Sequence, residues 1–496
     1  MNLKRNNINQ IAGMFFITIL VQFISLIRGS IVAYKFGISI ELDALNFSMS
    51  TIGVLFSFIS AGIGTILIPN LVKNKKGEDI NTFITFIVFI SFFIMILSLL
   101  FSNEISRLLS KNNNQYFLKI CGEMIQVISI NSFICIITSI LTAILNANNS
   151  FNSAKIINLI NIILIVSGML LFSNLNIYLY SLIILGSSFV SMVFSFYAVK
   201  KYNFKYRFII CLNDTTKNMI KAFLPVILSS ALYQVSILID NTIAIRLGEG
   251  QISILNYSNT IISMITILII GNIGTYLYPK LSKDIIYNKY KIFNYITVIN
   301  LITSLIIVLF LVEGKDLIKI LFERGSFTRD ITYMVYICCV LYISTMQING
   351  MRDLIYKYFF IFDDTKTPLK NSLLISIINI ISSIWLSKYM GIYGVVIGTV
   401  LGNLISIIII LIKFKNSFGF PNKIKKYLYV NTYIFFMPLI IIIIMNFIKH
   451  KFIINNIFFT IFLYSIFSSV IYIGGLLIIK KDLLFVIKEL GSGNIE

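Results

Sequence analysis

The sequence is poor in the residues that carry most soluble-protein chemistry. Only 12% of its 496 residues are charged, and it has one histidine, one tryptophan, six prolines and five cysteines, with no CxxC, HExxH or GxxxxGK[ST] pattern. These absences argue against a structural zinc site, a zinc protease and a nucleotide-driven pump within this chain. The scattered cysteines favour buried thiols over a disulfide framework.

What the sequence has in excess is apolar residues. It is 57% hydrophobic with a mean hydropathy of +0.90, which indicates an integral membrane protein. A span needs about 20 apolar residues, and such runs predict an all-α fold of about fourteen transmembrane helices. The predicted spans are 11–35, 44–71, 82–103, 117–147, 152–173, 176–199, 217–247, 252–279, 292–313, 330–358, 366–388, 391–414, 427–448 and 454–480.

The positions of the basic residues predict how the chain is oriented. Net charge is +21, and 28 of the 41 lysines and arginines lie in the two tails, the even-numbered connections and the adjoining span ends. The positive-inside rule therefore places both termini in the cytoplasm. The basic charge is then a topology signal with some attraction to membrane lipids, and no nucleic-acid partner is expected. The first apolar stretch is too long for a cleaved signal peptide.

The sequence contains an internal repeat. Residues 64–73 reappear as 274–283 at an offset of 210, residues 45–47 return as 255–257, and Phe36-Gly37 corresponds to Leu247-Gly248 one residue out of step. Six predicted spans separate the copies, so the repeat is parallel, a design in which substrate binds between two lobes. We expect an N-lobe at 1–210, a C-lobe at 211–420, and two additional spans at 421–496. Chance similarity between apolar helices is the alternative.

Two charges lie well inside predicted spans. Arg28 is in the first span and Asp240 in the seventh, at similar depth on corresponding helices of the repeat. A charge at such a depth costs a few kcal/mol unless it faces protein or water. One interpretation is a cavity in which Arg28 binds phosphate and Asp240 serves a coupling cation or an ion pair. Snorkelling to the outer interface is the other.

Further polar residues are weaker candidates. Asp43 lies at the outer end of the second span, where interfacial anchoring is an equal alternative to gating. Asn379, four residues before Ser383, and Thr399 could join Asp240 in binding a small cation, although interhelical hydrogen bonding is the commoner role. Arg352 and Lys357, at the inner end of the tenth span, could meet an anionic headgroup. Thr367 and Pro368 predict a helix start.

Two motifs resemble those of a known family. Residues 321–328, LFERGSFT, resemble the LFERGxF element of the MurJ/MviN lipid II flippase family, and residues 363–368, DDTKTP, resemble its DTxTP element. Arg28 stands where this family has its first-span arginine, and Asp43 matches its DAxxxA aspartate. The resemblance covers essentially the whole chain.

The resemblance implies a flippase that moves lipid-linked peptidoglycan precursor, lipid II, to the outer leaflet of the bacterial cytoplasmic membrane by alternating access, without enzymatic chemistry. It implies substrate binding at Arg28, Asp43, Asn259, Arg352 and Lys357, and coupling through membrane potential or a sodium ion at Asp240, Asn379 and Thr399. The partner would be a polyprenyl-pyrophosphate-linked saccharide whose tail contacts the last two helices. We expect a monomer with no other cofactor.

The chain departs from that family's pattern in its cavity cations. Thr260 follows Asn259 where the family has an arginine or lysine. Each lost charge-assisted contact forfeits about 1.5–3 kcal/mol. An exporter of another polyprenyl-linked repeat unit, of capsular, teichuronic or O-antigen type, is therefore an alternative. A cation-coupled drug antiporter, which Arg28 argues against, and a membrane scaffold are further alternatives.

Overall fold

The computed structural model describes residues 2–72, 77–110, 112, 114–148, 150–202, 204, 206–209, 213–271, 284, 288–362, 364, 366–451 and 456–484. These residues are almost entirely helical and include no strand. Twelve of the described helical segments are long and apolar enough to cross a membrane. The protein is therefore an all-α, multi-pass membrane protein, as predicted. The expected count of fourteen spans is consistent with the helix order and stays a prediction.

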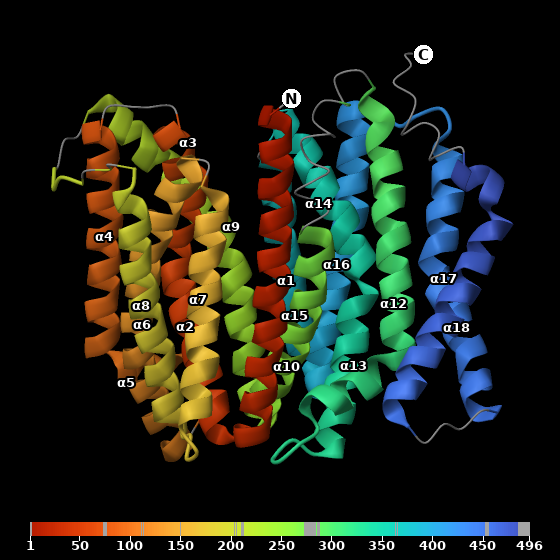
Figure 1. Ribbon diagram of the computed structural model, residues 1–496, viewed down its shortest axis with the longest axis horizontal. Helices are drawn as coiled ribbons and strands as arrows, with labels where there is room; N and C mark the ends of the chain where they lie inside the picture. The colour runs from red at the N-terminus through yellow and green to blue at the C-terminus, as the bar shows by residue number, and fades with distance from the viewer. Residues whose placement is uncertain are drawn as a thin grey trace. The chain divides into compact units, whose positions relative to one another are not determined.

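The chain divides into two compact units, Met1–Asn256 and Tyr257–Glu496. In each unit the long helices run side by side (Figure 1). Unit 1 contains α1 (Asn2–Phe36), α2 (Ile40–Gly62), α3 (Ile68–Val72), α4 (Gly77–Leu100), α5 (Ser102–Ser110), α6 (Gln115–Ala147), α7 (Phe151–Leu171), α8 (Ile177–Lys200), α9 (Asp214–Leu247) and the start of α10 (Gln251–Thr266). Within it, α2 packs against α6 and α9, and α1 packs against α7.

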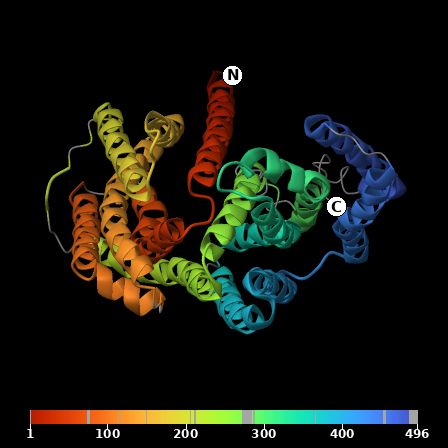
Figure 2. The same cartoon turned by 90° about the horizontal axis from the view of Figure 1, so that it is seen from below.

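Unit 2 contains the remainder of α10, α12 (Ile292–Phe322), α13 (Arg329–Ser344), α14 (Met346–Ile361), α15 (Lys366–Met390), α16 (Ile392–Phe418), α17 (Ile424–Lys451) and α18 (Ile457–Ile478). Here α12 is central, because it packs against α13, α14, α17 and α18. α17 and α18 form a pair at one edge of this unit (Figure 2).

The compact units and the lobes predicted from the sequence repeat have different boundaries. The repeat assigns 1–210, 211–420 and 421–496 from similarity, whereas packing places the division after Asn256. The repeat is nevertheless visible in local structure. α1 ends at Phe36 and α9 at Leu247, and the glycine that follows each helix has a positive φ, 55° at Gly37 and 136° at Gly248. The second copy of the 64–73 segment lies mostly outside the described residues.

Side chains with local hydrogen-bonding power set several helix starts. The Asn114 side chain accepts from the backbone N–H groups of Tyr116 and Phe117 at the start of α6, and Asn176 does the same for Leu179 in α8. Such caps pair N–H groups that a helix leaves without an internal partner. Between these ends, the apolar sequence of each span is sufficient for it to form a helix in a membrane.

Four predicted spans differ from the helices observed. The span predicted at 330–358 is two helices, α13 and α14, interrupted at Thr345, whose N–H and hydroxyl both bond to the Tyr342 carbonyl. The span predicted at 82–103 ends at Leu100, and the short helix α5 follows it. A π-helical turn, Ile63–Leu67, separates α2 from α3, and another, Ile267–Gly271, follows α10. Hydropathy does not register the two π-helical turns, because apolar residues continue across them.

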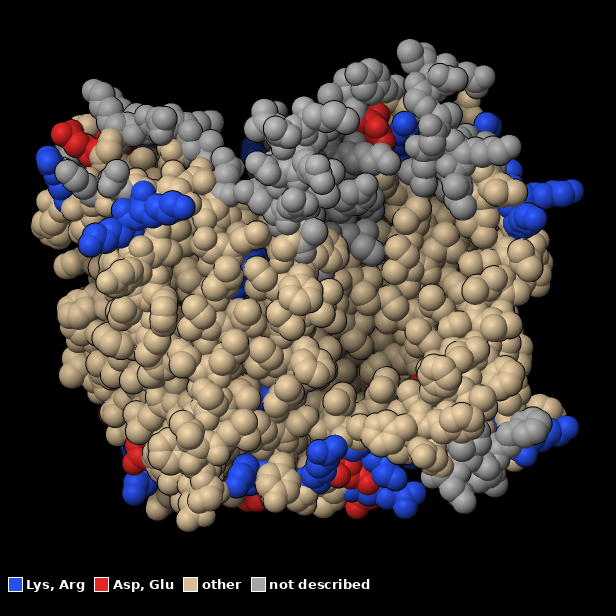
Figure 3. Space-filling model, in the orientation of Figure 1, with Lys and Arg blue, Asp and Glu red and all other residues tan. Residues whose placement is uncertain are grey.

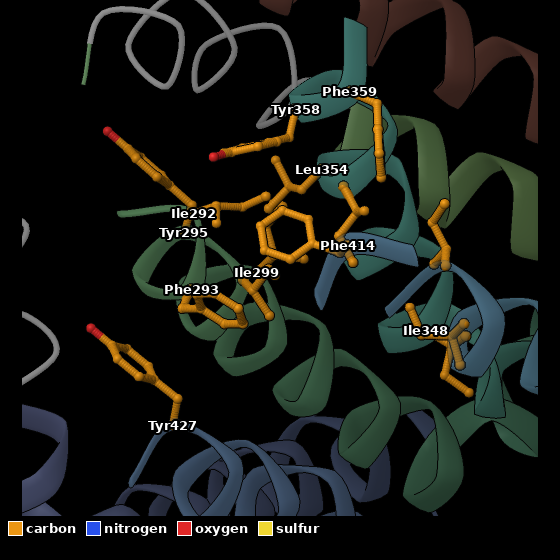
Figure 4. Packing of buried hydrophobic residues seen from close by; sticks show 14 residues of the cluster. Ile292, Phe293, Tyr295, Ile299, Ile348, Leu354, Tyr358, Phe359, Phe414 and Tyr427 are labelled. Carbon is orange, nitrogen blue, oxygen red and sulfur yellow. The ribbon is translucent and has the colours of Figure 1, made fainter. Parts of the chain in front are cut away.

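An aromatic cluster joins four helices of unit 2 (Figure 4). Phe414 of α16 lies 4.9 Å from the ring centroid of Tyr358 in α14 and 5.7 Å from that of Phe293 in α12. Phe293 in turn contacts Tyr427 of α17, whose hydroxyl bonds to the Asn294 side chain. Offset and edge-on aromatic pairs of this kind add stability beyond their buried area. The cluster thus holds α17 against the rest of unit 2.

Most charged side chains gather toward the ends of the helices, and the broad band between them on the visible face shows only a few (Figure 3). This is the distribution expected when the band lies in hydrocarbon and the ends lie at the two interfaces. Within that band, any charged or strongly polar side chain needs a specific partner or water. Those residues are the candidates for function.

Candidate functional site

Arg28 lies on α1 and is partly exposed. In the part of the chain that the structure describes, its guanidinium makes no hydrogen bond or ion pair. An arginine inside a span is stable when its planar fork meets water or an anion. Asp240, on α9 of the same unit, is buried with 9% of its surface exposed. The structure therefore leaves Arg28 available for a polar ligand and buries Asp240.

Asp43 is fixed by the helix that follows α9. Its Oδ2 accepts a hydrogen bond from the Gly250 backbone N–H at 2.6 Å, and its Oδ1 accepts from both the backbone N–H and the hydroxyl of Ser253, at 2.8 and 2.6 Å. The carboxylate thus binds the first turn of α10, where unpaired N–H groups favour an anion. Glu249 lies beside it, and both line a cavity of about 180 Å³. These contacts show Asp43 as a structural clasp.

The two basic residues of α14 are each paired within unit 2. Arg352 donates from Nη1 to the Asn403 side-chain oxygen of α16 at 2.7 Å. Lys357 lies 2.7 Å from Asp353, one helical turn earlier. The Arg352 hydrogen bond joins α14 to α16. Lys357 is neutralised by its neighbour, which leaves it the weaker candidate for an anionic headgroup.

Asn379 and Ser383 meet as their spacing predicted. The Ser383 hydroxyl contacts the Asn379 side-chain oxygen at 2.7 Å and the Val395 carbonyl of α16 at 3.2 Å. Asn379 is buried, whereas Thr399 on α16 is partly exposed. The hydrogen bond from α15 to α16 is the commoner role anticipated for such residues. A cation at Asn379 would have to share the oxygen that Ser383 now contacts.

Asn259 and Thr260 lie in the middle of α10, and both are exposed in this structure. The exposed position of Thr260 means that a longer side chain would meet no packed neighbour there. Packing therefore does not explain why this position has threonine where the family has an arginine or lysine.

The LFERG motif proves to be a structural turn. Gly325 has φ 58°, a conformation that glycine adopts without the strain other residues suffer. Arg324 donates to the Ile320 carbonyl at the end of α12. Phe327, 2% exposed, packs edge-on to Tyr257 with ring centroids 5.3 Å apart and also contacts Phe322. The motif closes the connection from α12 to α13.

The DTxTP element is likewise a helix start, but not at the predicted residue. Helix α15 begins at Lys366, and the capping group is Asp364, which accepts from the Thr367 N–H at 3.0 Å and from its hydroxyl at 2.7 Å. Burial acts to raise the pKa of Asp364, but the hydrogen bonds from Thr367 outweigh it and the pKa lies below its ordinary value. Asp364 lies three residues before Thr367, so Thr367 is already inside the helix and is not itself the cap.

Sequence reasoning missed an ion pair that connects α12 to α17. Lys449 lies 3.0 Å from Glu313, which is 1% exposed, and donates to the Val312 carbonyl at 2.6 Å. The ammonium also stands 5.2 Å from the ring centre of Tyr464 on α18. The signal available was an acidic residue at the end of an apolar run. Its partner is 136 positions away and could not be assigned from spacing.

The fold and these polar positions define a class of protein: a multi-pass membrane transporter. A solved structure of "Lipid II flippase MurJ, inward closed conformation" matches with a TM-score of 0.79 at 22% identity, covering 96% of this chain and 100% of that one. An inward-facing MATE family transporter of the MOP superfamily matches with a TM-score of 0.63 at 14% identity, covering 81% and 94%.

The sequence comparisons narrow the class to one family. The family model described as lipid II flippase MurJ matches residues 32–463. A probable lipid II flippase MurJ from Buchnera aphidicola subsp. Baizongia pistaciae is 26% identical over 409 residues, which is 77% of this chain and 79% of the relative. The chain belongs to the MurJ lipid II flippase family.

Proposed function

We propose that this protein translocates lipid II from the inner to the outer leaflet of the cytoplasmic membrane by alternating access. Family membership supports the substrate, and the likeness to a solved flippase supports the fold. The observation that carries the proposal is Arg28, a partly exposed arginine within a membrane span that has no hydrogen-bonding partner among the described residues. Such a group suits a diphosphate that passes through the membrane.

Arg28 would bind the pyrophosphate through its planar fork, which forms two parallel charge-assisted hydrogen bonds. Arg352, whose Nη1 donates to the Asn403 side chain, is proposed as a second cationic contact for the anionic substrate. No covalent step is needed, because the same lipid is released on the other side. We therefore propose a transporter without enzymatic activity.

Transport would be driven by the membrane potential or by a sodium ion at Asp240, Asn379 and Thr399. Asp240 supplies the one carboxylate of this set, and burial would strengthen its attraction for a cation. The Asn379 oxygen is already contacted by Ser383, so sodium binding there would rearrange that hydrogen bond. The site is thus proposed to depend first on Asp240.

The polyprenyl tail would lie along α17. A cavity of about 510 Å³ follows one face of this helix, lined mainly by apolar and aromatic residues with one lysine at its end: Lys425, Leu428, Tyr429, Thr432, Tyr433, Phe436 and Ile440. An isoprenoid chain requires a long apolar surface, and the lysine suits the phosphate end. We propose that the protein acts as a monomer with both termini in the cytoplasm.

The test is to deplete a host's own lipid II flippase, express this chain, and measure lipid II exposed on the outer face. We expect exposure to be restored, and Arg28→Ala to abolish the restoration while Arg28→Lys retains part of it, because lysine keeps the charge and loses the fork. Lys413→Gln, an exposed cation at the end of α16, is the matched control and should behave as the parent. Normal membrane insertion without restoration would refute lipid II as the substrate.

A further inference from the structure

Unit 1 contains a second cavity, which Arg28 does not line and which the proposed function does not use. Its volume is about 490 Å³, within the roughly 300–1,000 Å³ typical of ligand pockets. The walls come from α4, α6 and α8 and from the segment that follows α8. The lining residues are Ile84, Val88, Ile137, Ile140, Leu141, Ile144, Phe196, Val199, Lys200, Phe204 and Tyr206.

The cavity is apolar inside and basic at its rim. Ile140, Leu141 and Ile144 of α6 are each at most 6% exposed, whereas Lys200, the last residue of α8, is exposed. Lys201 and Arg207 are exposed as well. None of these three cations has an acidic partner among the residues that the structure describes. Their charges remain available for an anion at the membrane surface.

Two acidic residues lie in the first turn of α4, a helix that supplies one wall of the cavity. Glu78 and Asp79 begin α4, but neither lines the cavity. Asp79 is turned to the start of α9, where it accepts hydrogen bonds from Thr216 at 3.3 Å and from Asn213 at 3.4 Å. The rim therefore has a net positive charge.

The sequence that follows α8 is typical of a membrane interface. Residues 200–208, KKYNFKYRF, interleave four basic with four aromatic residues. Aromatic rings settle at the level of the lipid headgroups, and basic clusters at the end of a span attract anionic lipids. The Tyr206 hydroxyl lies 2.8 Å from that of Thr85 on α4. This bond attaches the basic segment to the mouth of the cavity.

The lining residues of α4 reach about the thickness of one leaflet from the start of this helix. Val88 is eleven residues from the start of α4, which is roughly 16 Å along the helix axis, and half of a hydrocarbon core is about 15 Å. A phospholipid acyl chain spans that depth, whereas a polyprenyl tail is several times longer. We propose that this cavity is a specific site for an anionic phospholipid, with one acyl chain among α4, α6 and α8 and the phosphate at Lys200 and Arg207.

The experiment is native mass spectrometry of the full-length protein in detergent, titrated with phosphatidylglycerol or with phosphatidylcholine of the same acyl chains. The parent should bind one phosphatidylglycerol with an affinity about tenfold or more above that for phosphatidylcholine. Lys200→Gln with Arg207→Gln should remove this preference. Lys413→Gln with Lys415→Gln, two exposed cations at the end of α16, should retain it.

A second variant tests the cavity itself. Val88→Trp fills the space and should weaken both lipids while leaving the rim charges in place. Equal binding of the two phospholipids by the parent, or equal loss in the rim and control variants, would overturn the proposal. So would displacement of phosphatidylglycerol by lipid II at an equal concentration, which would assign the site to the substrate. The readout is binding, so it stands whether or not the chain transports lipid II.

Discussion

Asp43 and Ser253 are hydrogen bonded to one another and are separated by 210 positions, which is the offset of the internal repeat. Each lies in the first turn of its helix, α2 for Asp43 and α10 for Ser253. The bond therefore joins equivalent positions of the two copies, although the residue types differ. A carboxylate in one copy faces the N–H groups and hydroxyl of the other.

Replacing Asp43 tests how much this clasp contributes. Asp43→Ala leaves the N–H groups of Gly250 and Ser253 without their partner, which should lower the free energy of unfolding by about 1–3 kcal/mol. Thermal unfolding of the purified protein in detergent measures the effect. Ser253→Ala removes only the hydroxyl contact and should cost about 1 kcal/mol. A stable Asp43→Ala protein that has lost lipid II export would instead show that the carboxylate acts in transport.

The Glu313 and Lys449 pair should be strongly coupled. Lys449→Met leaves a carboxylate that is 1% exposed without its counter-ion, and removal of one partner of a buried pair costs roughly 3 kcal/mol. Glu313→Gln should cost less, because Lys449 keeps its bond to the Val312 carbonyl. The double variant should be more stable than Lys449→Met alone. Unfolding of the four proteins completes the cycle, and additive effects would show that the charges do not interact.

Three glycines on α16 allow its backbone to pack directly against α15. A Cβ at Gly398 would lie 2.4 Å from the Ser383 hydroxyl, and one at Gly394 would lie 2.3 Å from the Leu386 carbonyl. Small residues every four positions permit this close approach. Gly398→Ala should therefore destabilise the protein by about 1–3 kcal/mol.

The matched control for that substitution is Gly186→Ala on α8, where a Cβ would meet nothing within 4 Å. Alanine should there stabilise the helix by roughly 0.5–1 kcal/mol. Opposite signs of the two changes in unfolding temperature are expected. Equal changes at both positions would mean that helix propensity, and not the α15 contact, decides the outcome.

Thr260→Arg should strengthen lipid II transport. The position is exposed on α10, so the longer side chain needs no repacking, and it adds a donor for a phosphate. The depleted host described above, assayed for exposed lipid II at low expression, should show an increase of about tenfold at most, the equivalent of about 1.4 kcal/mol. Thr260→Gln is the uncharged control. An unchanged rate in the arginine variant would indicate that this position does not meet the substrate.

The helices and the family could be predicted from the sequence, because apolar runs and two turn motifs are local signals. Because these signals are local, the sequence did not predict the helix breaks or the position of one helix cap. The π-helical turns keep an apolar composition, so hydropathy does not register them. The break at Thr345 lies among polar residues, but the flanking apolar runs still give Arg329–Ile361 the composition of one span. The cap of α15 was predicted at Thr367, but the capping side chain is Asp364. Threonine and aspartate are both good capping residues, so the sequence alone does not decide between them.

The candidate site could be predicted only as a set of residue types. Arg28 was found because a charge within a span is conspicuous, and the structure places it partly exposed. The clasp between Asp43 and Ser253 and the pair of Glu313 with Lys449 depend on partners more than 100 positions away. The glycine spacing of α16 was visible in the sequence, but the helix that it faces was not.

With Gly394, Gly398 and Gly402 of α16 turned to α15, neither a side chain nor an acyl chain fits into the seam between these helices. The surrounding lipid therefore contacts α15 and α16 as one continuous surface. Helices α15 and α16 therefore move together in the bilayer, and lipid does not pass between them into unit 2.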